Sequence, residues 1–239
     1  MIRKVLAVSD LHGNLKDLNF EGIDVVVIAG DFAELKGGGK WHLHDQKKWI
    51  QKKFIPLCEK FPEVDFCVIP GNHDMCLDPK KIALCHGVDL RISWPANVHL
   101  LIDQEIEVKG LKIYGTPQIP IISRRWAFEC EHEELVKKFS KIPENLDILI
   151  THSPPHIPDS SIDRSNQFGG YEAFGSGELA QAIFEKSPRY VFCGHIHTGT
   201  HDEVMFESSK LYNVSRVDEY YEIAYEPKVL EIEVNEKVV

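Results

Sequence analysis

Five short polar motifs in this sequence combine residue types that can bind metal ions and transfer protons. They are Asp10-Leu11-His12, Gly30-Asp31, Gly71-Asn72-His73-Asp74, Thr151-His152 and Gly194-His195-Ile196-His197. An amide oxygen can ligate a hard cation, an imidazole can ligate a metal or transfer a proton, and a carboxylate can orient either group. The motif around Asn72 offers all three side-chain types in one turn, so it is the chemical centre of the set.

Each motif follows a short apolar run that is typical of a buried β-strand. The runs are Val5–Ser9, Val25–Ala29, Phe66–Ile69, Leu146–Ile150 and Tyr190–Cys193. Ligand sites of α/β sheets gather beyond the carboxyl ends of the strands, so the five motifs are expected to meet at one edge. In an extended segment residues i and i+2 point to the same side, which lets Asp10 converge with His12, and His195 with His197.

The donor atoms of these motifs are carboxylate, imidazole and amide groups, without a thiolate. This hard-to-borderline set suits Mn, Fe, Zn or Ni, with Mn or Fe favoured, rather than copper(I) or a structural zinc. There are more donors than one tetrahedral ion can use. Two ions about 3.5 to 4 Å apart, bridged by a shared carboxylate and by water, would use all of them.

The ordered set D-x-H, G-D, G-N-H-D, H and G-H-x-H resembles the calcineurin-like metallophosphoesterase superfamily, and it extends from Asp10 to His197. The resemblance implies an α/β fold: a four-layer α-β-β-α sandwich with two mixed β-sheets and a dinuclear metal site at the C-terminal ends of the strands. Residues 1–239 are expected to form this single domain. The segment Gly30-Asp31-Phe32-Ala33-Glu34 departs from the family pattern, which usually continues to a glycine, and this departure concerns the shape of the loop.

The same resemblance implies a role for each polar residue. One ion would be held by Asp10, His12, Asp31 and His197, and the second by Asp31, Asn72, His152 and His195. His73 would face the leaving group and Asp74 would orient its imidazole. A bridging hydroxide would attack the phosphorus in line, and protonated His73 would donate to the departing oxygen. Two divalent ions outweigh the charges of Asp10 and Asp31, so the pocket would attract a phosphate.

A looser resemblance points to the small cyclic-nucleotide-phosphodiesterase-like branch, which includes metallophosphoesterase-domain-containing proteins. It rests on Tyr114-Gly115-Thr116-Pro117, Arg125-Trp126-Ala127-Phe128, Pro154-Pro155 beside His152, and Leu211-Tyr212-Asn213-Val214-Ser215. It implies a phosphodiester substrate of nucleotide size. Arg124, Arg125 and Trp126 could contact a phosphate and a base, and His156 is a further candidate contact. The alternatives are a solvated arginine pair and a tryptophan that anchors the core.

Composition limits the possible partners. The chain has 27 Lys and Arg against 37 Asp and Glu, a net charge of -10, which opposes binding of long nucleic acid or an anionic membrane. No stretch approaches the roughly 18 apolar residues of a membrane span, and the N-terminal apolar run is too short for a signal peptide. Six cysteines without a C-x-x-C pair favour a reducing compartment. We therefore expect a cytoplasmic hydrolase that acts on a small phosphoester or nucleotide.

Two other functions fit parts of the pattern. A phosphomonoesterase acting on a small metabolite or phosphoprotein would use the same metals, and it is the main alternative to a phosphodiesterase. A non-catalytic metal-binding scaffold ranks lower, because such a protein has no clear use for His73. The net charge disfavours a nuclease for long substrates.

The remaining segments are expected to form helices, a meander and loops. Helices are expected over Asp45–Cys58 with Asp45 as the cap, over Glu131–Ser140 and from Ser176 to Lys186. Short strands are expected from Val98 to Tyr114 with a turn at Lys109-Gly110, and Glu34–His44 and His156–Gly175 are expected to be loops.

Overall fold

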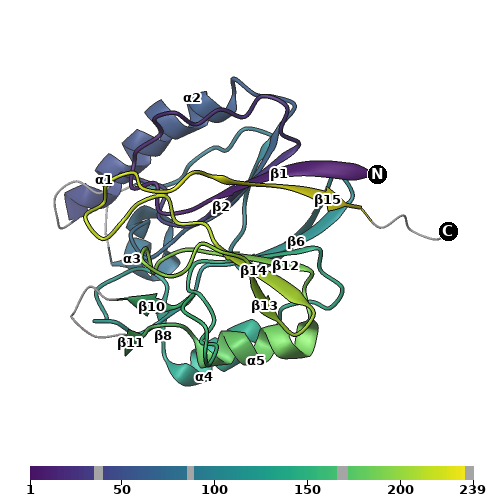
Figure 1. Ribbon diagram of the computed structural model, residues 1–239. Helices are drawn as coiled ribbons and strands as arrows, with labels where there is room; N and C mark the ends of the chain where they lie inside the picture. The colour runs from purple at the N-terminus through teal and green to yellow at the C-terminus, as the bar shows by residue number, and fades with distance from the viewer. Residues whose placement is uncertain (35–39, 85–88, 166–171, 235–239) are drawn as a thin grey trace.

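Two large mixed β-sheets form the centre of the computed structural model, which describes residues 1–34, 40–84, 89–165 and 172–234 (Figure 1). The first sheet has the order β15 (Lys228–Glu233), β1 (Ile2–Val8), β2 (Val25–Ala29), β3 (Asp65–Ile69) and β4 (Val98–Leu100). The second has the order β13 (Val204–Phe206), β14 (Ser209–Asn213), β12 (Tyr190–Cys193), β9 (Ile148–Thr151), β6 (Leu111–Thr116) and β5 (Gln104–Val108). Within each sheet the inner strands are parallel, and β15, β13 and β5 are antiparallel to their neighbours.

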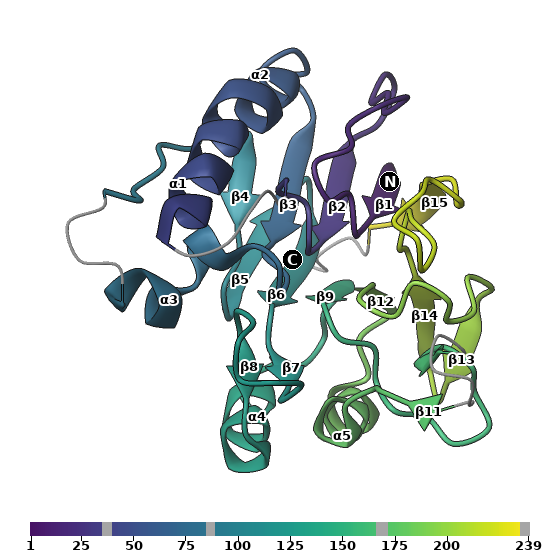
Figure 2. The ribbon, with the colours of Figure 1, turned by 90° about the vertical axis from the view of Figure 1, so that its left-hand side faces the viewer.

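Helices cover the outer face of each sheet, as Figures 1 and 2 show. The first sheet is covered by α1 (Lys40–Trp49), the π-helical η1 (Ile50–Phe54) and α2 (Ile55–Cys58), and the second by α4 (His132–Phe139) and α5 (Gly177–Lys186). The shorter elements are η2 (Met75–Leu77), α3 (Pro79–Ala83), and the strand pairs β7 (Ile119–Pro120) with β8 (Glu129–Cys130) and β10 (Arg164–Ser165) with β11 (Glu172–Ala173). This is the expected α-β-β-α arrangement of layers.

Strand β2 shows why the central strands are apolar without interruption. Val25, Val27 and Ala29 pack between the two sheets, whereas Val26 and Ile28 pack on the side of the first helical layer. Because successive side chains point to opposite faces and both faces are covered, every position is buried. These buried strands hold the residues that follow their C-terminal ends in fixed positions at one edge of the sheet.

The two sheets meet at that edge through a short backbone contact. The Ser9 N–H donates to the Val214 carbonyl at 2.7 Å, and the Arg216 N–H donates to the Ser9 carbonyl at 3.0 Å. This parallel bridge between Ser9 and Ser215 lies just beyond the ends of β1 and β14. The C-terminal ends of the parallel strands in the two sheets are therefore held side by side.

The first helix differs from its expected bounds. It begins at Lys40, so Asp45 lies inside α1 and the prediction of Asp45 as its cap is wrong. Leu43 is only 6% exposed and packs in the core under this helix, which explains why the helix starts before Asp45. The glycines of the expected loop, Gly37, Gly38 and Gly39, lie outside the described residues.

The segment Val98–Tyr114 is divided between the sheets instead of forming one meander. Strand β4 pairs with β3 in the first sheet, while β5 and β6 form an antiparallel pair in the second around the expected turn at Lys109-Gly110. Alternation predicted the strands but carries no information about which sheet each one joins.

The other two expected helices are confirmed, with α5 capped by the Ser176 hydroxyl, which accepts from the Leu179 N–H. The expected loop His156–Gly175 contains the pair β10 and β11, and residues 166–171 lie outside the described part. Within the described residues, no helix combines the length and apolar character that crossing a membrane requires.

Candidate metal centre and its pocket

The expected ligands lie directly beyond the carboxyl ends of the central strands. Asp10 follows β1, Asp31 follows β2, Asn72 follows β3, His152 follows β9 and His195 follows β12. The backbone turns sharply at several of these positions: φ is 54° at Asp10, 51° at Asp31 and 68° at His195. Left-handed backbone is unfavourable for such residues, and strain of this kind is found at functional sites where the surrounding structure enforces it.

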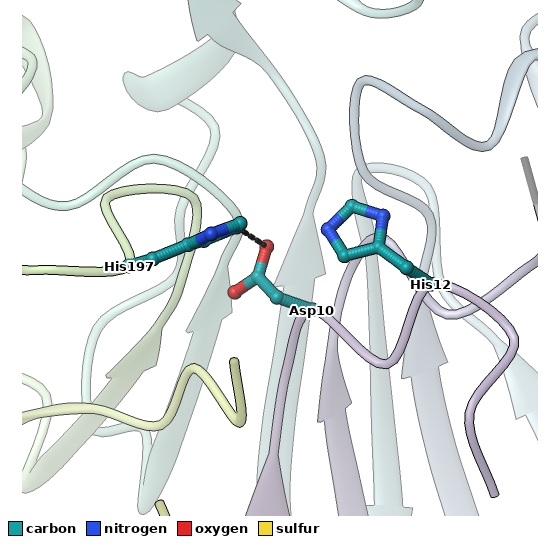
Figure 3. A group of neighbouring side chains, drawn as sticks. All are labelled: Asp10, His12 and His197. Atoms are coloured by element: carbon teal, nitrogen blue, oxygen red, sulfur yellow. Dashed lines mark ion pairs between the residues drawn. The ribbon is translucent and has the colours of Figure 1, made fainter. Parts of the chain in front are cut away.

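Asp10, His12 and His197 form one cluster, in which the candidate ligand atoms lie within 4.8 Å of one another. Figure 3 shows the Asp10 carboxylate between the two imidazoles, with His12 on the same loop and His197 arriving from the loop after β12. One Asp10 oxygen is 3.5 Å from Nε2 of His197. The other accepts from the Ser215 hydroxyl at 2.6 Å and from the His195 N–H at 3.0 Å.

Backbone carbonyls fix the orientation of two of the histidines. Nδ1 of His197 is 2.9 Å from the Asp218 carbonyl, and Nδ1 of His152 is 2.8 Å from the Ala29 carbonyl. A carbonyl only accepts, so Nδ1 donates in both rings and Nε2 is turned into the site. Metal-ligating histidines are held in this way by the hydrogen bond of their second nitrogen.

The second cluster surrounds His152 and contains Asp10 and Asp31. Nε2 of His152 lies 2.9 Å from the Asn72 side-chain oxygen and 3.3 Å from an Asp31 oxygen. Because Nδ1 already donates to a carbonyl, Nε2 of a neutral ring has no proton. Its lone pair would then face the oxygens of Asn72 and Asp31, which also carry lone pairs. Burial alone would lower the pKa of His152, but Asp31 raises it to about 9. Positive charge near Nε2 of His152 is therefore favourable, and a divalent ion bound there would supply it.

Two other histidines are suited to ligation in the neutral form. Both ring nitrogens of His12 are buried and have no hydrogen-bond partner among the described residues. Burial lowers the pKa of His12 to about 4, and burial together with His152 lowers the pKa of His195 to about 3. Unpaired buried nitrogens are uncommon in proteins, so the environment of His12 fits a metal ligand.

Opposing effects act on the pKa values of the two carboxylates of the site. Burial raises them, but His197 holds the pKa of Asp10 well below its usual range, and His152 does the same for Asp31. Both are fully covered from solvent, with exposed fractions of 0% and 1%. Buried carboxylates and imidazoles around a common centre form a donor set for divalent cations, so these residues could hold a metal ion.

His73 forms a third group of candidate ligands with His12 and Asp31, and Asp74 does not make the expected contact with its imidazole. Its carboxylate accepts from the backbone N–H groups of Gly71 and Ala33, both at 2.8 Å, and from that of Phe32 at 3.3 Å. Nδ1 of His73 is buried without a hydrogen-bond partner, so Asp74 does not hold the imidazole directly. Burial and the charge of Asp31 raise the pKa of Asp74 to about 7. Asp74 instead joins the loop after β2 to the turn after β3.

A cavity of about 620 Å³ opens beside the cluster. The metal-site residues on its wall are Asp31, Asn72, His73, His195 and His197, and the other described lining residues include Pro120, Ile121, Ile122, Trp126, Phe174, Glu219 and Tyr221. No lysine or arginine is among the described residues that line it. The positive charge that attracts a phosphate into this cavity would therefore have to come from the metal centre.

The proposed substrate contacts do not all reach this cavity. Trp126 lines it, whereas Arg124, Arg125 and His156 are not among its described lining residues. Arg124 pairs with Glu131 at the surface, and Nδ1 of His156 is 2.8 Å from an Asp163 oxygen.

Several residues of the site were missed in the sequence. The Tyr221 ring lies 4.7 Å from the His12 ring and 5.3 Å from the His197 ring, measured between centroids. Tyr221 belongs to an irregular segment, so nothing in the pattern marked it. Ser215, which donates to Asp10, follows a buried strand as the ligands do, and that position could have identified it.

Comparisons with known proteins show the family to which the chain belongs. The family model of the calcineurin-like phosphoesterases matches residues 3–199. Human metallophosphoesterase domain-containing protein 1 is 29% identical over 82% of this chain and 61% of its own length. UPF0046 protein T07D4.2 of Caenorhabditis elegans is 28% identical over 89% of this chain and 55% of its own length. The chain thus spans somewhat more than half the length of these relatives.

The fold is also shared with solved structures. The phosphopantetheinyl hydrolase PptH of Mycobacterium tuberculosis superposes with a TM-score of 0.55 at 13% identity, over 99% of this chain and 98% of that one. Because the family model covers the motifs from Asp10 to His197 and the metal-binding cluster lies where those motifs converge, the chain belongs to the calcineurin-like phosphoesterase family.

Proposed function

We propose that this protein hydrolyses a phosphodiester of nucleotide size with the help of two divalent metal ions, Mn or Fe. The observation that carries the proposal is the metal-binding cluster at the wall of the 620 Å³ cavity. That volume lies within the range of about 300 to 1,000 Å³ that is usual for small-ligand pockets. Membership of the calcineurin-like phosphoesterase family supports the coarser activity, metal-dependent phosphoester hydrolysis.

The charge of the cavity favours a diester over a monoester. A phosphodiester carries one negative charge, whereas a monoester near neutral pH carries between about 1.5 and 2. The described lining contains no lysine or arginine, and it contains Glu219 beside Tyr221. The apolar wall of Pro120, Ile121 and Ile122 offers a surface for a second organic arm, which only a diester has.

The chain supplies ligands, orientation and a proton donor. When bound, the two ions would activate water and stabilise the phosphoryl oxygens. Asp10, His12, Asp31 and His197 would hold one ion, and Asp31, Asn72, His152 and His195 the other. His73 lies at the cavity wall and would donate to the departing oxygen. Asp74 would fix the turn of His73 through the backbone.

Two model substrates test the proposal. We expect the purified manganese-loaded protein to cleave bis-p-nitrophenyl phosphate with a higher kcat/KM than p-nitrophenyl phosphate, and to lose both activities on chelation. A preference for the monoester would favour the phosphomonoesterase. Metal retained without turnover of either substrate would contradict the enzyme and favour a scaffold.

A further inference from the structure

Trp126 covers one face of the imidazole of His73. The two ring centroids are 4.4 Å apart and the ring planes are inclined by 29°, which is a stacked arrangement. The nearest Asp31 oxygen is 3.9 Å from Nε2 of His73, too far for a hydrogen bond, and Nδ1 is buried without a partner. Among the described contacts, ring packing rather than hydrogen bonding therefore sets the plane of this imidazole, with Trp126 stacked on one face and the His12 ring in an edge contact at 4.9 Å.

The loop that carries Trp126 is organised around one buried carboxylate. Glu129 is 8% exposed, and one of its oxygens accepts from the N–H groups of Ile122, Ser123 and Arg124 at 2.7, 2.7 and 3.0 Å. Its other oxygen accepts from the Trp126 N–H at 2.8 Å. Burial would raise the pKa of Glu129, but these donors bring it below its usual value. A charged acceptor with several amide donors fixes a loop firmly.

The same loop is tied to the turn that contains His73. The Ala127 N–H donates to the carbonyl of Asn72 at 3.0 Å, and the Phe128 N–H donates to Asp78 at 3.1 Å. The indole and the imidazole therefore belong to two segments that are held together next to the point where the rings meet. A stack restrains a ring plane without using either ring nitrogen, which leaves both nitrogens available for proton transfer.

We propose that Trp126 is a positioning residue for His73, and that Glu129 holds the Ile122–Trp126 loop so that the indole keeps the imidazole aimed at the leaving group. The inference rests on the proposed role of His73 as the proton donor. It gives Trp126 a function through His73 rather than through a base of the substrate, and it assigns Glu129 a function in the site although Glu129 does not line the cavity.

Kinetics with two leaving groups tests the positioning role. Proton donation matters for a poor leaving group such as an alkoxide and little for p-nitrophenolate. We expect Trp126→Ala to lower kcat about tenfold or more on an alkyl phosphodiester and less than about twofold on a p-nitrophenyl diester, as loss of oriented acid catalysis predicts. KM should stay nearly constant, and Trp126→Phe, which keeps an aromatic face, should restore most of the rate.

A double-mutant cycle separates this role from that of a substrate wall. In a His73→Ala background, Trp126→Ala should cause no further loss, because the group it positions is already absent. A loss of the same size in that background, or an effect on KM alone, would overturn the inference in favour of direct substrate contact. Manganese content, measured in every variant, should remain that of the unmodified protein.

Nuclear magnetic resonance tests the stack without any activity. In metal-free protein labelled in its histidine rings, which avoids paramagnetic broadening by manganese, the carbon-bound protons of His73 should be shifted upfield by the indole. Trp126→Ala and Glu129→Ala should both remove this shift, and Glu133→Ala, a change of an exposed carboxylate on α4, should preserve it. Unshifted His73 protons in the unmodified protein would overturn the stack. A wild type inactive on all phosphoesters would contradict the proposed function, and these spectra would still decide whether the indole holds the ring.

Discussion

The histidines of the site are held in two different ways. His152 and His197 each donate Nδ1 to a backbone carbonyl, which fixes both the tautomer and the direction of Nε2. His73 has no such bond and is packed against an indole instead. A metal ligand needs one nitrogen in a constant position, whereas a proton donor must change its protonation state in every cycle. The local contacts thus distinguish His152 and His197 from His73, whereas His12, a proposed metal ligand, also has no hydrogen bond to its ring among the described residues.

Replacement of His73 by alanine should reduce proton donation without removing metal. We expect kcat on an alkyl phosphodiester to fall about 100-fold, the lower end of the usual contribution of a general acid, with a much smaller fall on a p-nitrophenyl diester. Steady-state kinetics and elemental analysis of the same samples measure both quantities. His132→Ala, on the exposed side of α4, is the control. Equal losses on the two substrates would contradict the assignment.

Asp31 should matter for metal binding, because it shares one group of candidate ligands with His12 and another with His152. Asp31→Asn keeps the shape and removes the charge. We expect the metal content of the purified protein to fall by at least half in this variant, as determined by elemental analysis after dialysis. Asp24→Asn, at the opposite end of β2, should leave it unchanged. Full occupancy in Asp31→Asn would rule out a bridging role.

At the scale of elements, the end of a buried strand was the most informative feature of the sequence. Parallel strands covered on both faces appear as uninterrupted apolar runs, so the positions of Asp10, Asp31 and Asn72 could be predicted. The partner of each strand could not be predicted, because β4 and β5 follow one another in sequence and yet join different sheets. The hydrogen-bond partners of Asp74 could not be predicted either, because sequence spacing does not distinguish a neighbouring imidazole from neighbouring backbone amides.

The loops that follow β2 and β3 approach one another closely at Gly71. A Cβ at Gly71 would lie 2.2 Å from an Asp31 oxygen and 2.5 Å from the Asp31 backbone nitrogen. Because backbone must move to make room, we expect Gly71→Ala to lower the free energy of unfolding by about 1 to 3 kcal/mol, the usual effect of overpacking. Urea denaturation measures it. Gly177→Ala, where a Cβ meets nothing within 4 Å, is the matched control, and an equal effect in both variants would refute the argument.

At the scale of the molecule, three apolar cores separate four layers, and the polar groups gather at one edge. The chain carries a net charge of -10, so the positive potential that a phosphate needs has to come from the bound ions. We therefore expect bound metal to determine both the charge of the pocket and the electrostatic cost of burying Asp10 and Asp31 together.

Removal of metal should destabilise the fold. An ion that binds only the folded state at 100 times its Kd adds about 2.7 kcal/mol to the free energy of unfolding. We therefore expect a chelator to lower Tm and added manganese to restore it, as calorimetry can measure. The Asp31→Asn protein serves as the control, because its Tm should respond much less. A Tm that is unaffected by chelation would show that no ion is bound in the folded protein.

Asp10 accepts from groups that lie 185 and 205 residues further along the chain, the His195 N–H and the Ser215 hydroxyl. Contacts over such distances in sequence close late in folding, because the loop entropy must be lost before they form. The donor set for the ions hence exists only when almost the whole chain is folded. We expect manganese to leave the refolding rate unchanged and to slow unfolding, so that a cell short of metal would still produce this protein quickly but lose it sooner.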